Sequence, residues 1–158
     1  QGRDADELLA ILASKSRDNS RTPMQWNSGE GGGFTAGEPW IALCDNYREI
    51  NAEAALADPE SVFYAYQQLI TLRKSTPVLT WGDYQDLLPE HPSLWCYRRQ
   101  WQGQTLVVVA NLSREFQRWQ PEAVAGEWQR LMSNYAEAAN RPANMTLRPF
   151  EAVWWLQE

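Results

Sequence analysis

The sequence predicts a mixed fold, in which an irregular, helix-containing region over residues 1–76 precedes an antiparallel β-sandwich over residues 77–158. Three observations lead to this prediction. The segment 17–43 is rich in glycine, proline and tryptophan and shows no regular period. A helical stripe of apolar residues follows over 58–75, and after Pro77 short apolar runs alternate with turn residues. This change of period sets the predicted boundary between the two regions.

Three helices are expected in the first region. Residues 4–15 place leucines and an isoleucine at helical spacing, with acids in the first turn, which predicts a short amphipathic helix. The alanine-rich run 50–57 predicts a second helix. The strongest pattern opens at residue 58 or 59 and ends at Ser75, before a proline that cannot continue the helix. Its apolar stripe consists of Val62, Phe63, Tyr66, Leu69, Ile70 and Leu72.

The second region reads as short strands separated by turn residues such as Gln102-Gly103. Because side chains alternate across a strand, Trp154 and Trp155 are expected on opposite faces of a sheet. The many tryptophans of this region are expected to pack in the core or at a domain contact, with an exposed sugar-stacking platform as the alternative. The expected strands are 78–81, 84–88, 94–101, 105–112, 117–119, 129–133, 145–148 and 152–156.

Composition argues against two classes of partner. The formal net charge of −6 disfavours nucleic acid and anionic membrane surfaces, since both attract basic patches. No apolar run approaches the ~18 residues of a membrane span, and no signal peptide is recognised. We therefore expect no nucleic-acid or membrane partner and a cytoplasmic location, with Cys44 and Cys96 as reduced thiols. The sequence has no cluster of cysteine and histidine residues that would predict a metal site.

The segment from Arg17 to Trp26 concentrates polar and aromatic groups in a stretch that Pro23 keeps from being helical. Two guanidinium groups, a carboxylate, two amides and an indole suit a ligand with many hydroxyl groups, bound by charge-assisted hydrogen bonds and ring stacking. The alternative is a surface loop whose arginines pair with nearby acids. The glycines at 31–33 are expected to form a flexible tip rather than a phosphate-binding loop.

Further short motifs follow this segment in a fixed order. They are Arg-Asp-Asn-Ser-Arg-Thr-Pro-Met-Gln-Trp at 17–26, Gly-Phe-Thr at 33–35, Pro-Trp at 39–40, Asn-Tyr-Arg-Glu-Ile-Asn at 46–51, Ser-Val-Phe at 61–63, Leu-Arg-Lys at 72–74 and Leu-Arg-Pro-Phe-Glu-Ala at 147–152. In these motifs and their spacing, the chain resembles the oligo-1,6-glucosidase branch of the α-amylase glycoside hydrolase family over nearly its whole length.

The resemblance implies a specific architecture. Residues 1–76 would be the loop region and final helix at the C-terminal end of a catalytic (β/α)8 barrel, and residues 77–158 the C-terminal β-sandwich domain. The nucleophile Asp, acid/base Glu and stabilising Asp of the family lie on earlier barrel strands, and the motifs around them are not found here. Because the chain also begins at Gln1 without a methionine, we expect a segment of a longer protein, with no catalytic residue of its own and no activity alone.

The resemblance also implies the activity of the parent protein, a retaining α-glucosidase that needs no organic cofactor. Within the branch, the chain most resembles the members that hydrolyse trehalose 6-phosphate to glucose and glucose 6-phosphate. Two alternatives stay open. The parent could be an oligo-1,6-glucosidase or dextran glucosidase acting on α-1,6-glucan oligosaccharides. The tryptophan-rich sandwich could instead be a non-catalytic carbohydrate-binding or structural module.

Three residues are taken as substrate-binding candidates, namely Arg17, Asn19 and Arg21. In the family, the residue at the position of Arg17 reaches toward the glucosyl subsite and pairs with an acid from an early barrel loop. A guanidinium suits that role because its planar fork holds two partners at fixed geometry. For Asn19 and Arg21 the alternative is that they brace the loop.

The aromatic side chains of the irregular segment are a second group of candidates. Trp26, Phe34 and Trp40 could stack on sugar rings, although we favour packing against the rest of the protein. Arg48 is a candidate for recognising a phosphate group.

Overall fold

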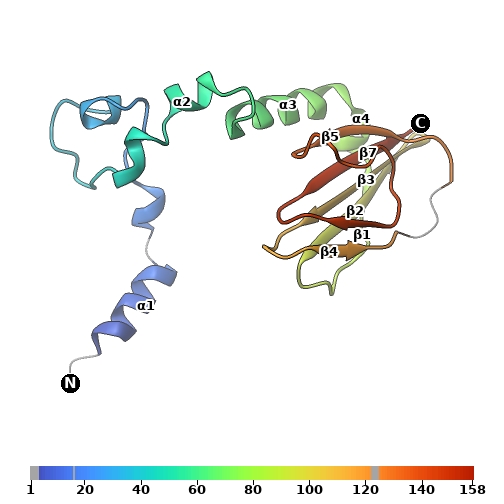
Figure 1. Ribbon diagram of the computed structural model, residues 1–158, viewed down its shortest axis with the longest axis horizontal. Helices are drawn as coiled ribbons and strands as arrows, with labels where there is room; N and C mark the ends of the chain where they lie inside the picture. The colour runs from blue at the N-terminus through green and yellow to red at the C-terminus, as the bar shows by residue number, and fades with distance from the viewer. Residues whose placement is uncertain (1–3, 16, 122–124) are drawn as a thin grey trace. The chain divides into compact units, whose positions relative to one another are not determined.

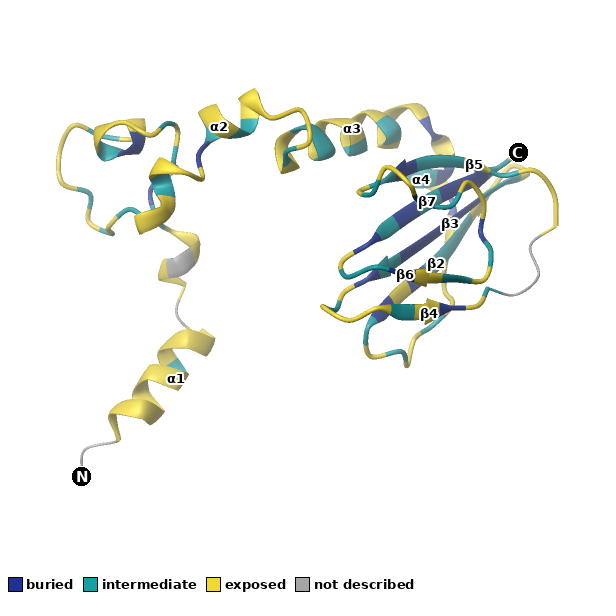
Figure 2. Ribbon diagram, viewed as in Figure 1, coloured by how far each residue is buried: buried dark blue, intermediate teal, exposed yellow. Residues whose placement is uncertain are grey.

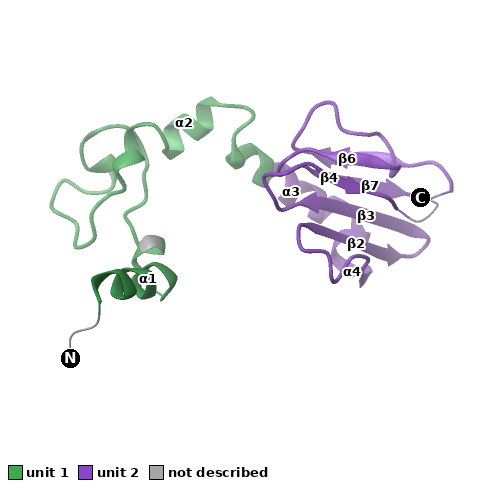
Figure 3. Cartoon of the chain, turned by 60° about the horizontal axis from the view of Figure 1, so that its bottom comes forward, with its two compact units in different colours: residues 1–66 green, residues 67–158 purple. Residues whose placement is uncertain are grey.

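The computed structural model describes residues 4–15, 17–121 and 125–158 (Figure 1). The chain divides into two compact units, Gln1–Tyr66 and Gln67–Glu158, each described here by itself (Figure 3). The division falls within the long helix α3 (Val62–Ser75). Among the helices that the structure describes, none is long and apolar enough to cross a membrane.

Unit 1 consists of short helical elements joined by irregular chain. Its elements before α3 are α1 (Ala5–Lys15), η1 (Asp18–Ser20), η2 (Glu30–Gly33), η3 (Asp45–Arg48) and α2 (Ala52–Ala57), where η denotes a 3₁₀-helix. The predicted helices at 4–15 and 50–57 are confirmed. The second begins at Ala52, because Asn51 is its N-cap and accepts a hydrogen bond from the backbone N–H of Ala54 at 2.8 Å.

Helix α3 begins later than predicted. The prediction of helix from residue 58 or 59 was wrong. The carboxylate of Asp58 accepts a hydrogen bond from the backbone N–H of Glu60 at 2.9 Å, and the carbonyl of Asp58 accepts one from the N–H of Ser61 at 3.0 Å. This local side-chain bond holds the chain in a turn and competes with helix formation. The predicted end of the helix at Ser75 is confirmed.

Unit 1 buries few side chains. Of its described residues only Pro23, Gly32 and Asn51 are buried, while Leu9 is 62% and Trp40 is 83% exposed. Figure 2 shows unit 1 mostly in the colour of exposed residues. Both clusters of buried apolar residues in the described chain belong to unit 2. Unit 1 therefore lacks an apolar core among the described residues.

Unit 2 contains an antiparallel β-structure. Five strands pair in the order β1-β2-β3-β7-β5, and β4 pairs with β6 in a separate two-stranded sheet. The strands are β1 (Asp83–Asp86), β2 (Leu94–Trp101), β3 (Gln104–Asn111), β4 (Gln117–Trp119), β5 (Gln129–Ser133), β6 (Met145–Leu147) and β7 (Ala152–Gln157). Seven of the eight predicted strands are thus confirmed. The predicted turn between β2 and β3 is also present, with positive φ at Gln102 and Gly103.

The five-stranded sheet buries a different cluster on each face. Toward the two-stranded sheet, Trp155 lies fully buried and stacks on Trp119, with ring centroids 5.6 Å apart. On the other face, Leu106 and Val108 pack with Val78 of helix α4 (Pro77–Trp81), and Trp154 packs against this second cluster. Trp154 and Trp155 therefore face opposite sides, as predicted. Three layers result, in which the large sheet lies between α4 and the small sheet.

The strand predicted at 78–81 was wrong, because these residues form α4. Valine, threonine and tryptophan favour strands, but Pro77 occupies the first helical position, where its fixed φ and missing N–H favour a helix. The guanidinium of Arg99 on β2 donates to the carbonyls of Leu79, at 2.6 Å, and Gly82, at 2.7 Å. A residue distant in sequence thus satisfies the carbonyl groups at the end of this short helix.

Both cysteines are free, as predicted; Cys44 is half-buried and Cys96 is buried. Burial raises the pKa of the Cys96 thiol to about 12. A hydrogen bond with Trp119 lowers this pKa, but by less than burial raises it.

Candidate functional site

The segment that begins at Arg17, which the sequence predicts to bind a polar ligand, starts with the single 3₁₀ turn η1. The carbonyl of Arg17 accepts the backbone N–H of Ser20 at 3.1 Å and its hydroxyl at 2.8 Å. The N–H of Arg21 donates to the carbonyl of Asp18 at 3.0 Å. Arg17 and Arg21 are both exposed, and the side chain of Asn19 lies outside the described part of the structure. The turn therefore fixes the backbone of the two arginines and leaves their side chains at the surface.

The chain after this turn is held by backbone hydrogen bonds to distant residues. The carbonyls of Gln25 and Trp26 accept the N–H groups of Ala52 and Glu53, at 2.9 and 3.0 Å, at the start of α2. The Gln25 side-chain amide also donates to the carbonyl of Ile50. The first N–H groups of a helix have no acceptors within the helix. This extended segment supplies carbonyl acceptors for those of α2.

The glycines at 31–33 complete this scaffold, and the prediction of a flexible tip was wrong. Gly32 is buried, and its carbonyl accepts the N–H of Trp26 at 2.8 Å and of Asn27 at 3.1 Å. Its φ of 62° favours glycine, and a Cβ atom there would lie 2.9 Å from a methyl carbon of Leu43. All three glycines have positive φ, and they form a tight turn in which Gly32 is buried.

The folding of these segments produces a hollow of about 180 Å³ within unit 1. It brings Arg21 together with two of the predicted aromatic residues, Phe34 and Trp40. Arg17 and Trp26 do not line it, nor does Arg48, whose guanidinium lies 5.4 Å from the ring centre of Tyr47. The lining residues are Arg21, Thr22, Pro23, Phe34, Thr35, Pro39, Trp40 and Ile41.

The chemical character of the hollow is that of a donor-rich, aromatic site. Arg21 is the one ionisable residue among those that line it, and Thr22 and Thr35 add hydroxyl groups. Trp40 is 83% and Phe34 is 50% exposed, so their rings are accessible. A cation, hydroxyl donors and exposed rings together suit a sugar or a sugar carrying an anionic group.

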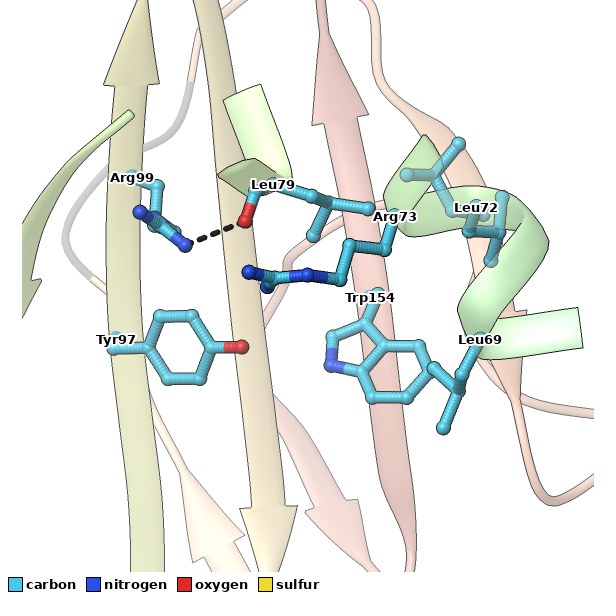
Figure 4. A pocket seen from close by; sticks show the side chains of 8 residues that line it. Leu69, Leu72, Arg73, Leu79, Tyr97, Arg99 and Trp154 are labelled. Carbon is cyan, nitrogen blue, oxygen red and sulfur yellow. Dashed lines mark hydrogen bonds between the residues drawn. The ribbon is translucent and has the colours of Figure 1, made fainter. Parts of the chain in front are cut away.

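A second cavity, of about 200 Å³, lies in unit 2 between the helices and the sheet (Figure 4). Figure 4 shows Tyr97 of β2 and Trp154 of β7 with their polar atoms turned toward one another, and Arg73 reaching toward them from α3. Burial raises the pKa of Tyr97 above its usual value. Four leucines line this cavity, which makes it an apolar gap in the packing of helices on the sheet. The leucines are Leu69, Leu72, Leu79 and Leu131.

Sequence reasoning missed this cavity, because it depends on α4, which was predicted as a strand. It also missed the polar residues that organise the loops. Asn111, although buried, donates to the carbonyls of Glu115 and Arg148 at 2.7 and 2.8 Å. Glu151 is buried and accepts the backbone N–H of Arg148 at 2.8 Å. Within the described ranges, no group of three or more His, Cys, Asp or Glu residues is placed to hold a metal ion.

Comparison with known proteins identifies relatives that match nearly the whole chain. The trehalose-6-phosphate hydrolase of Escherichia coli (strain K12) is 71% identical over 157 residues, which are 99% of this chain and 28% of that protein. The oligo-1,6-glucosidase of Halalkalibacterium halodurans is 44% identical over 159 residues, again 99% of this chain and 28% of that protein. The crystal structure of Bacillus licheniformis trehalose-6-phosphate hydrolase (TreA) matches with a TM-score of 0.91 and 41% identity, over 98% of this chain and 29% of that one.

The chain thus spans less than a third of the length of these relatives. The sequence profile of the alpha-amylase family, described as the alpha amylase catalytic domain, matches residues 1–82. This match extends over more than half of the 158 residues. The matched part contains the residues that line the hollow, the segments that hold them in place, and helices α3 and α4. The chain belongs to the alpha-amylase family.

Proposed function

We propose that this chain is the C-terminal segment of a retaining α-glucosidase that hydrolyses trehalose 6-phosphate to glucose and glucose 6-phosphate. The observation that carries the proposal is the 71% identity, over 99% of the chain, to the trehalose-6-phosphate hydrolase of Escherichia coli. In this assignment residues 1–76 are the loop region and final helix of the (β/α)8 barrel, and residues 77–158 are the C-terminal β-sandwich. The many exposed apolar side chains of unit 1 support the assignment, because an element at the end of a barrel packs against the rest of it.

The proposed reaction is a double displacement. A retaining glycosidase uses two carboxyl groups about 5–5.5 Å apart, one as nucleophile and one as acid and base. We infer that these carboxylates come from barrel strands outside this chain, so that the chain alone is inactive. Its own contribution is to bind and orient the sugar through Arg17, Asn19 and Arg21.

Arg17 is the strongest of these binding candidates. It is exposed at the start of η1, where its carbonyl is held by both the N–H and the hydroxyl of Ser20. A fixed backbone limits the conformations that the guanidinium loses on binding, which favours the two-pronged hydrogen bonds of a sugar subsite.

Replacement of Arg17 tests this role in the full-length enzyme. We expect Arg17→Ala to lower kcat/KM by about 10-fold to 100-fold, the value of a lost charge-assisted hydrogen bond. Because Arg17 is exposed, the melting temperature should shift by no more than about 2 °C. Arg114→Ala, another exposed arginine but in unit 2, is the matched control and should leave both quantities unchanged. Unchanged kinetics in Arg17→Ala would reject the assignment.

An oligo-1,6-glucosidase or dextran glucosidase is the second candidate function. The 44% identity to the Halalkalibacterium halodurans oligo-1,6-glucosidase supports it. Steady-state kinetics of the full-length protein with trehalose 6-phosphate and with isomaltose separate the two. A higher kcat/KM for trehalose 6-phosphate supports the first proposal, and a higher value for isomaltose supports the second.

A further inference from the structure

We propose that the hollow of unit 1 receives the phosphorylated end of the substrate, so that Arg21 sets the preference for phosphorylated over unphosphorylated α-glucosides while Trp40 stacks on the sugar ring. The inference rests on the proposed function and deepens it, since it names the residues that select the charged substrate. It follows from the charge, the free donors and the exposed aromatic surface of the hollow.

The charge of the hollow is opposite to that of the chain. The chain carries a formal net charge of −6, yet the residues that line the hollow include one arginine and no acid. Glu38 precedes the lining residue Pro39 in sequence but is not itself part of the lining. A local positive site on an acidic protein is favourable for an anionic ligand, and a guanidinium binds the oxygens of a phosphate group with two parallel hydrogen bonds.

The hydroxyl of Thr35 adds a donor of defined direction. Its oxygen accepts the backbone N–H of Gly37 at 3.0 Å. A hydroxyl group that accepts one hydrogen bond still has its own proton to donate. Thr35 and Arg21 line the same hollow, so both can donate to one anionic group there.

Trp40 supplies the surface for the sugar ring. At 83% exposure it is the most exposed tryptophan in the described chain, and Phe34 beside it is 50% exposed. Indole rings combine a large apolar face with a polar edge, which suits the apolar face and hydroxyl rim of a hexose. The hollow of about 180 Å³ is smaller than the roughly 300–1,000 Å³ of pockets that enclose a whole drug-sized ligand. It therefore fits one end of a disaccharide, not the whole molecule.

Two pairs of variants of the full-length enzyme test the inference. Arg21→Gln removes the charge in the hollow, and Arg114→Gln is its control, because Arg114 is an exposed arginine that does not line the hollow and has no proposed role in binding. Trp40→Leu removes the ring, with Trp81→Leu as the control at an exposed tryptophan outside the hollow. The measurements are kcat and KM for trehalose 6-phosphate and for trehalose, the inhibition constants of glucose 6-phosphate and glucose, and the melting temperature.

We expect the two variants to act differently. Arg21→Gln should lower the ratio of kcat/KM for trehalose 6-phosphate to that for trehalose by about 10-fold to 100-fold, mainly through KM, and raise the inhibition constant of glucose 6-phosphate by a similar factor. Trp40→Leu should lower kcat/KM for both substrates by the same factor of about 2-fold to 10-fold. Both controls should keep the wild-type ratio and the wild-type kcat/KM for each substrate.

Other outcomes overturn the inference or separate it from the proposed function. If the wild type hydrolyses trehalose 6-phosphate and Arg21→Gln keeps the wild-type ratio, the inference is wrong and the proposed function stands. A Trp40→Leu variant with a lower melting temperature and unchanged kinetics would show that Trp40 packs against another part of the protein. If the wild type prefers isomaltose, the proposed function fails. In that case, inhibition of isomaltose hydrolysis by glucose 6-phosphate still tests the inference. Equal inhibition of the wild type and of Arg21→Gln would overturn the inference as well.

Discussion

Different kinds of internal contact stabilise unit 1 and unit 2. Unit 2 buries two apolar clusters, one on each face of its large sheet, with side chains such as Trp155 and Leu106 fully removed from solvent. Unit 1 relies on backbone hydrogen bonds and on caps such as Asn51, and it leaves Trp40 and the leucines of α1 exposed. Hydrogen bonds contribute little net stability compared with apolar burial. In the proposed assignment, the unit that carries the candidate site is therefore the one that depends most on the rest of the barrel.

The largest expected effect is the loss of the central tryptophan of unit 2. Trp155 stacks on Trp119 and donates its indole N–H to the carbonyl of Ala139 at 2.8 Å. We expect Trp155→Ala to lower the free energy of unfolding of unit 2 by about 3–5 kcal/mol, because a large cavity remains. Denaturant unfolding followed by circular dichroism measures it. Trp81→Ala, at a position 66% exposed, is the control, and an equal loss in both variants would contradict the described core.

The next effect concerns Arg99, which joins the helix side of unit 2 to its sheet. Its guanidinium donates to the carbonyls of Leu79 and Gly82 at the end of α4. Arg99→Met should lower the free energy of unfolding by about 1–3 kcal/mol, since these carbonyls lose their partners. Arg98→Met removes a neighbouring arginine that donates to the side chain of Gln85 and should cost less than about 1 kcal/mol. A cost of Arg99→Met no larger than that of Arg98→Met would show that α4 does not need this contact.

A smaller and local effect is expected in unit 1. Asn51→Ala removes the cap of α2 and should destabilise that helix by about 1 kcal/mol. Hydrogen–deuterium exchange is the appropriate measurement, because it resolves the opening of a single helix. Exchange of the Ala54 amide should rise about 5-fold, while amides of β3 in unit 2 stay protected. Equal acceleration in both units would mean that they unfold together.

The smallest expected effect is a pH dependence caused by Cys96. Its pKa in the folded chain is about 12, above the ordinary value of 9.0, so the neutral thiol stabilises the fold below pH 9. That contribution is lost as the pH rises from 9 toward 12, and the stability lost by pH 9.5 is less than about 1 kcal/mol. The free energy of unfolding should therefore fall more steeply between pH 8 and pH 9.5 in the wild type than in Cys96→Ala. Parallel slopes would contradict the buried thiol.

Sequence reasoning predicted the elements whose information is local. The alternation over 94–101 predicted β2 with both its ends, and the side-chain period of a strand placed Trp154 and Trp155 on opposite faces. It failed at 78–81, where β-favouring residues adopt a helix because Pro77 precedes them and Arg99, from a later strand, satisfies the carbonyls. Distant contacts of this kind leave no signal in the local pattern.

The candidate site was only partly predictable for the same reason. The motif around Arg21 and the nearby aromatic residues were recognised as sugar-binding candidates, but their meeting in one hollow depends on the irregular chain between them. That chain is shaped by the left-handed Gly32 and by hydrogen bonds that the first N–H groups of α2 donate to the carbonyls of Gln25 and Trp26. No period describes such a loop, so only the structure shows that Phe34 and Trp40 join Arg21 and that Arg17 does not.

The most direct test of this account compares the 158-residue chain with the full-length protein in one assay of glucose release from trehalose 6-phosphate. We predict that the full-length protein releases glucose and that the chain alone releases none above the buffer control, because in the proposed assignment its arginines bind sugar and the catalytic carboxylates lie on barrel strands outside it. Turnover by the chain alone would place the nucleophile and the acid/base among its twenty acidic residues, and would contradict its placement at the end of the barrel.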